Sequence, residues 1–187
     1  NLELLSNLKQ KNKLILDIES VHYFDNIDYF DEKINIDDKP KICIIGTIFE
    51  KNKEPIFKDF TINYLKNEEE KKIILYFIHY LKNIFQDEKI YIYHWGNAEK
   101  VYIQYIKHKY PELKLPNFEL VDLCYHFKNE PIIIRGCFNY GLKTISKMLY
   151  ELGFIDNIWP EDINGLDAMY QIIECSKKSE EKNIPLK

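Results

Sequence analysis

The stretch Leu14-Ile15-Leu16-Asp17-Ile18-Glu19-Ser20 places two carboxylates within an otherwise aliphatic segment. Side chains of a strand alternate between faces, so Asp17 and Glu19 point to one side while Leu16 and Ile18 point into a core. Two neighbouring anions repel each other, and each resists leaving water. A hard divalent cation prefers oxygen ligands and would remove that repulsion. The pattern therefore indicates a metal site, and the alternative is a pair of surface acids near the end of a strand.

The composition fits one domain of an intracellular protein. A chain of 187 residues with 45% hydrophobic residues is long enough for one core, and we expect an N-terminal extension over 1–12 and a single domain over 13–187. No apolar run approaches the roughly 20 residues of a membrane span, so we expect no membrane contact. The four cysteines lack a C-x-x-C pair, which argues against a zinc site and predicts free thiols in the cytoplasm or nucleus. The net charge of -4 gives no global basic surface, although local lysine clusters still allow nucleic-acid binding.

The order of hydrophobic patterns predicts an α/β fold with a mixed five-stranded sheet and helices on both faces. Alternating or continuous apolar runs predict strands, in chain order, at Lys13–Glu19, Lys41–Phe49, Ile56–Tyr64, Lys89–His94 and Phe118–Leu123. Helical spacing of apolar residues predicts helices at 73–85, Ala98–Lys109, Gly141–Leu152 and Leu166–Cys175. The first three strands form an antiparallel meander, and right-handed crossovers then place the later strands beside the first, at the centre of the sheet.

A third acid follows the strand that ends at His94. Sites in open α/β sheets lie at the carboxyl ends of strands and at the helix starts that follow. Glu99 lies in the first turn of such a helix, so we expect it to reach Asp17 and Glu19. The alternative is that the helix dipole favours an acid at this position, with Asn97 as the N-cap.

Other polar residues near the strand ends allow two interpretations. Asp122 ends a predicted strand and either joins the metal site or caps a short helix over Leu123–Phe127. His94 and Trp95 either face the site or pack in the core with satisfied polar tips. The cations that follow are candidate phosphate contacts or ordinary solvated side chains: Arg135, Lys143 and Lys147.

Four motifs in this order resemble the ribonuclease H-like fold, and within it the 3′–5′ exonucleases of the DEDD type. The chain is most similar to the YprB-like group of predicted nuclease domains, which accompany RecB-type nucleases and helicases. The resemblance covers roughly residues 13–175. Its motifs are Asp17-Ile18-Glu19, Tyr93-His94-Trp95-Gly96-Asn97-Ala98-Glu99, Val121-Asp122-Leu123 and Tyr140-Gly141-Leu142-Lys143.

The resemblance implies a two-metal-ion nuclease that hydrolyses phosphodiester bonds of DNA or RNA with Mg²⁺ or Mn²⁺, in a setting such as DNA repair. Asp17 would bridge both ions, with Glu19, Glu99 and Asp122 as further ligands. His94 would position the attacking water or act as a base. Nucleic acid would contact Lys100 and Lys143 through phosphates and stack its bases on Tyr23 and Trp95. A helicase or another nuclease domain in the parent protein is the implied partner.

The sequence departs from this group at its last motif. The group has a Tyr-Asn pair followed by an Asp on a C-terminal helix, and that Asp completes the metal site. No such motif occurs here, and Asp167 is the nearest substitute. We therefore expect either a nuclease domain that lacks its last helix within this sequence, or a catalytically degenerate module that binds nucleic acid or another protein.

Overall fold

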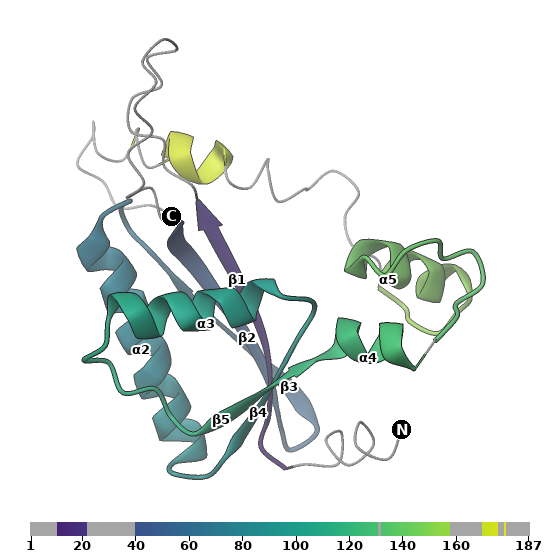
Figure 1. Cartoon of the computed structure of the whole chain (residues 1–187), viewed down its shortest axis with the longest axis horizontal. Coiled ribbons are helices and arrows are strands. Elements are labelled where there is room, and N and C mark those ends of the chain that lie inside the picture. Colours follow the sequence, from purple (N-terminus) through teal and green to yellow (C-terminus); the bar gives the residue numbers. More distant parts are fainter. Residues whose placement is uncertain (1–10, 22–39, 131, 158–169, 176–177, 179–187) are drawn as a thin grey trace.

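The computed structural model of the chain describes residues 11–21, 40–130, 132–157, 170–175 and 178. The elements in chain order are β1 (Lys13–Val21), β2 (Lys41–Lys51), β3 (Glu54–Thr61), α2 (Asn67–Phe85), β4 (Ile90–His94), α3 (Ala98–Lys109), β5 (Phe118–Asp122), α4 (Leu123–Asn129) and α5 (Leu142–Glu151). The strands form one five-stranded sheet in the order β3-β2-β1-β4-β5, in which β1 pairs antiparallel with β2 and parallel with β4 (Figure 1). The predicted α/β fold with a mixed sheet is confirmed, and its first strand lies at the centre.

Two helices, α2 and α3, cover one face of the sheet (Figure 1). The residues of β1 that face them are the buried Leu14, Leu16 and Ile18, and these pack with apolar residues of both helices. Burial of each such side chain stabilises the fold by about 1.5–3 kcal/mol. The short helix α4 and the helix α5 follow β5, and their first residues border the opposite face. Among the described helices, none combines the length and apolar character that a membrane crossing needs.

A buried carboxylate fastens both helices to the sheet. Glu70, in the first turn of α2, accepts a hydrogen bond from the backbone N–H of Ile42 at 2.8 Å. It also accepts from the hydroxyl of Tyr105 at 3.0 Å and from that of Tyr110 at 2.6 Å. Lys109 completes the arrangement as an ion pair. A buried charge is stable when it is paired and hydrogen-bonded, so Glu70 fixes α2 and α3 against β2.

Most element ends lie within two residues of the sequence predictions. The exceptions are β3, which spans Glu54–Thr61 in place of the predicted Ile56–Tyr64, and α2, which begins at Asn67, six residues before the predicted 73–85. The helix Ala98–Lys109 has the predicted bounds, and the first strand continues two residues beyond the prediction, to Val21. Between β2 and β3 the chain turns at Asn52 and Lys53, whose φ angles are 55° and 67°. Positive φ at both central residues is typical of the two-residue turns that match the right-handed twist of a hairpin.

Three predicted features lie wholly or largely outside the described residues. These are the N-terminal extension over 1–12, the loop over 20–40 with Tyr23, and the segment that contains Asp167. The predicted helix Leu166–Cys175 is described over 170–175, where the chain is helical.

Candidate functional site

The two carboxylates of β1 lie on the face of the sheet opposite α2 and α3. Asp17 and Glu19 are exposed, whereas the alternate residues Leu16 and Ile18 are buried. The alternation of side chains along a strand predicted this pattern. The ladder between β1 and β2 becomes irregular directly after Glu19. Because both side chains are exposed, both acids keep contact with water, and the solvent partly screens the repulsion between them.

A groove of about 630 Å³ runs over this face of the sheet. Asp17 and Glu99 both contribute to its lining, together with Lys58 and Asp59. Pockets of this size hold small organic ligands or several ring-sized groups. Most of its wall is apolar, from residues Ile15, Ile48, Phe57, Tyr93, Trp95, Leu123 and Leu142.

Glu99 brings a third carboxylate toward β1. It lies in the first turn of α3, and its side chain is buried. Partial loss of water raises the pKa of Asp17, and the negative charge of Glu99 raises it further. Loss of water also raises the pKa of Glu19, as do the charges of Asp17 and Glu99, while Lys143 acts in the opposite direction. The three carboxylates, from two separate elements, thus act on one another electrostatically.

His94 and Glu99 form a buried pair whose facing atoms are unsatisfied. His94 is the last residue of β4, and its Nδ1 lies 3.4 Å from Oε2 of Glu99. Neither atom has a hydrogen-bond partner among the described residues. An unsatisfied buried polar group costs about 1–3 kcal/mol, so such atoms are typical of sites that bind a water or an ion. Because the His94 side chain is only 2% exposed, its position favours a role through Glu99 over direct contact with a substrate.

Trp95, in contrast, has a satisfied polar tip. Its Nε1 donates to the carbonyl of Tyr140 at 2.9 Å, and its ring packs 5.1 Å from that of Phe127. These contacts join the end of β4 to α4 and to the start of α5. Trp95 still lines the groove, so the structure gives it a packing role beside the predicted stacking role.

Asp122 is the N-cap of α4. Its Oδ1 accepts from the backbone N–H of Tyr125 at 3.1 Å and from that of Gly96 at 3.0 Å. The capping alternative from the sequence analysis is therefore confirmed. This oxygen already has two donors, which leaves Oδ2 as the atom of this side chain for any further ligand.

The predicted nucleic-acid contacts occupy different elements. Lys100 is exposed on α3, and Lys143 is exposed in the first turn of α5, where its charge acts on Glu19. Tyr23 lies outside the described residues. Of these side chains, Lys143 is therefore the one that the structure relates directly to the carboxylates.

Sequence reasoning missed Asp59, which lies on the same face as Asp17. The ladders pair Gly46 of β2 with Asp17 on one side and with Asp59 of β3 on the other. Gly46 has no side chain that would separate the two acids. The two-residue turn at Asn52 and Lys53 fixes the register of the hairpin, and this register pairs Gly46 with Asp59. The sequence therefore contained a signal that could have placed Asp59 on this face.

The donor atoms at this site fit a hard divalent cation. Mg²⁺ and Mn²⁺ prefer carboxylate oxygens, and Glu99 offers an unsatisfied one. Within the described part of the chain, however, no three His, Cys, Asp or Glu side chains already converge closely enough to hold a metal ion. A cation would therefore have to draw Asp17, Glu19 and Glu99 together by side-chain movement.

Comparison with known proteins gives no family assignment. The sequence matches no protein-family model and no curated protein. The function must be inferred from the chemistry of the site, since a fold alone does not determine an activity.

Proposed function

We propose that the protein is a nuclease that hydrolyses phosphodiester bonds of DNA or RNA with the help of Mg²⁺ or Mn²⁺, in the manner of a 3′–5′ exonuclease. The observation that carries this proposal is the groove that Asp17 of β1 and Glu99 of α3 line together, and the charge of Glu99 raises the pKa of both Asp17 and Glu19. Like charges held near each other without a compensating cation are unfavourable, and a bound dication turns the repulsion into attraction. The proposed ligands are Asp17, Glu19 and Glu99.

Each part of the site has a separate task in this proposal. When bound, the ions would supply a water of lowered pKa and a counter-charge for the leaving oxygen. Asp17 and Glu19 hold their carboxylates on the open face of the central strand, and Glu99 adds its own from α3. Lys143, whose charge acts on Glu19, would contact a phosphate of the substrate. The apolar wall of the groove offers flat surfaces to sugars and bases.

Cleavage assays test the proposal directly. Labelled single- and double-stranded DNA and RNA are incubated with the purified protein and Mn²⁺, and the products are resolved by size. Asp17→Ala and Glu99→Gln are expected to abolish cleavage, while the control Asp87→Asn, an exposed acid in the turn after α2, should cleave normally. Equal cleavage by the Asp17→Ala variant would contradict the proposal.

The second candidate is a catalytically degenerate module that binds nucleic acid or another protein on the same fold. The absence of a ready three-ligand group among the described residues favours it. A module that binds nucleic acid would bind oligonucleotides without cleaving them, and one that binds a protein would do neither. In both cases Mn²⁺ would not bind in a manner that depends on Asp17.

A further inference from the structure

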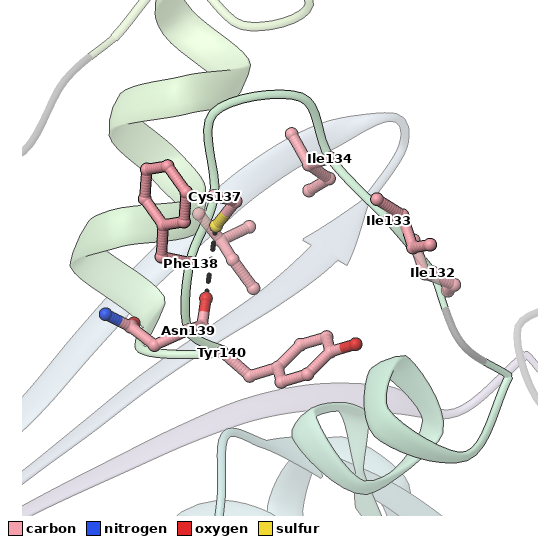
Figure 2. A pocket seen from close by; sticks show the side chains of 8 residues that line it. Ile132, Ile133, Ile134, Cys137, Phe138, Asn139 and Tyr140 are labelled. Atoms are coloured by element: carbon pink, nitrogen blue, oxygen red, sulfur yellow. Dashed lines mark hydrogen bonds between the residues drawn. The ribbon is translucent and has the colours of Figure 1, made fainter.

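The loop between α4 and α5 forms an arch whose two limbs carry Ile132–Ile134 and Phe138–Tyr140 (Figure 2). Backbone hydrogen bonds fix the arch: Ile132 N–H donates to Phe127 at 3.1 Å, and Cys137 N–H donates to Ile134 at 3.0 Å. The limbs enclose a hollow of about 170 Å³. The loop is therefore a defined surface and not merely a connection.

Large apolar side chains project from this arch into solvent. Phe138 is 97% exposed and Ile133 is 86% exposed. Exposure of one large apolar side chain is ordinary, but two of them at near-complete exposure on one short loop are typical of a binding surface.

The described part of the arch carries a single charge, which is positive. Residues 132–140 contain no Asp or Glu, and their one cation is Arg135, the single arginine of the sequence. The next cations along the chain, Lys143 and Lys147, lie on α5. A guanidinium binds phosphate in a planar, bidentate manner that an ammonium cannot reproduce. A ligand for this loop therefore carries negative charge and flat apolar faces.

We propose that the arch binds an unpaired nucleic-acid strand, with a base stacked on Phe138 and a phosphate held by Arg135. This inference rests on the proposed function, because a strand bound on the arch would be the substrate of the same site. Trp95 donates to the carbonyl of Tyr140 at the end of the arch, and Leu142, two residues later, lines the groove that contains Asp17. A strand bound on the arch thus continues toward the carboxylates.

Fluorescence anisotropy with a labelled oligothymidylate, in EDTA so that no cleavage occurs, tests this surface. Phe138→Ala is expected to weaken binding roughly tenfold without changing the salt dependence, since stacking is not ionic. Arg135→Gln should weaken binding and lower the slope of log affinity against log salt by about 0.7, the value for one phosphate of a single strand. Arg135→Lys should keep that slope but lose part of the affinity.

The matched control is Tyr76→Ala, which removes an aromatic side chain that is 52% exposed on α2, and it should bind as the wild type does. Wild-type affinity in both Phe138→Ala and Arg135→Gln would overturn the proposal, even if the protein cleaves nucleic acid. Failure of the wild type to bind the oligonucleotide would also overturn it and would point to a protein partner for the arch. Binding that depends on the arch, in a protein that never cleaves, would support this inference and contradict the nuclease.

Discussion

Replacing Asp17 by Asn should stabilise the folded protein when no metal is present. Asparagine keeps the shape of the side chain but removes one of three mutually repelling charges. The pKa of Asp17 is raised by partial loss of water and by Glu99, and that of Glu19 by partial loss of water, then by Asp17 and Glu99. Ionisation of these acids therefore costs folding free energy.

The size of the gain follows from the exposure of the site. Asp17 and Glu19 keep contact with water, so the repulsion between them is screened. Exposed charge pairs contribute about 0.2–1 kcal/mol, and we expect a gain in unfolding free energy within this range. In a chain of this length, 1 kcal/mol raises the melting temperature by about 2–4 °C.

The pH dependence has a definite sign. The folded chain holds the protons of Asp17 and Glu19 more tightly than the unfolded chain, so stability is lost as the pH rises from the unfolded to the raised folded pKa. Above that window the wild type has the full repulsion, and Asp17→Asn should show its largest advantage. Below it the acids are neutral, and the advantage should vanish.

Circular dichroism melting curves in EDTA, recorded from neutral pH down into the acid range, measure this difference. Asp87→Asn removes an exposed acid elsewhere and serves as the control. A melting temperature of Asp17→Asn equal to or below that of the wild type at neutral pH would refute the proposed repulsion.

Three further predictions concern the residues around the site. Glu70→Gln should lower the unfolding free energy by about 3 kcal/mol in urea denaturation, because Lys109 loses its buried partner; a loss below about 1 kcal/mol would contradict this role. Asp122→Ser keeps a capping oxygen and should retain stability, whereas Asp122→Ala should lower the unfolding free energy by about 1 kcal/mol. Loss of Mn²⁺ binding in the serine variant would instead establish that Asp122 is a metal ligand. His94→Asn keeps a nitrogen near Glu99 and should retain Mn²⁺ affinity, whereas His94→Leu should lose about 10- to 100-fold; equal affinities would show that His94 only packs.

The central architecture could be predicted because hydrophobic periodicity and chain crossovers determine it. The alternation in Leu14–Ser20 identified a strand with one polar face, and the helical spacing that precedes Phe85 identified the first covering helix. Right-handed connections then placed the first strand at the centre of the sheet, where the structure has it.

Side-chain contacts between distant elements could not be predicted in the same way. Glu70 reads as one acid in the run at a helix start, and only the packed structure reveals that Tyr105 and Tyr110 enclose it. Asp59 is a different case, because the register of the β2–β3 hairpin follows from the turn at Asn52 and Lys53 and could have been read from the sequence. The contacts of Glu70 depend on the three-dimensional packing, and the local sequence does not encode them.

Calorimetric titration with Mn²⁺ tests the central claim most directly, because it needs no substrate. The wild type and the Asp87→Asn control are expected to bind Mn²⁺ with millimolar or better affinity, and Asp17→Asn and Glu99→Gln should each lose that binding. Binding of equal strength in all four proteins, or no binding in any of them, would contradict the claim that these carboxylates share a cation.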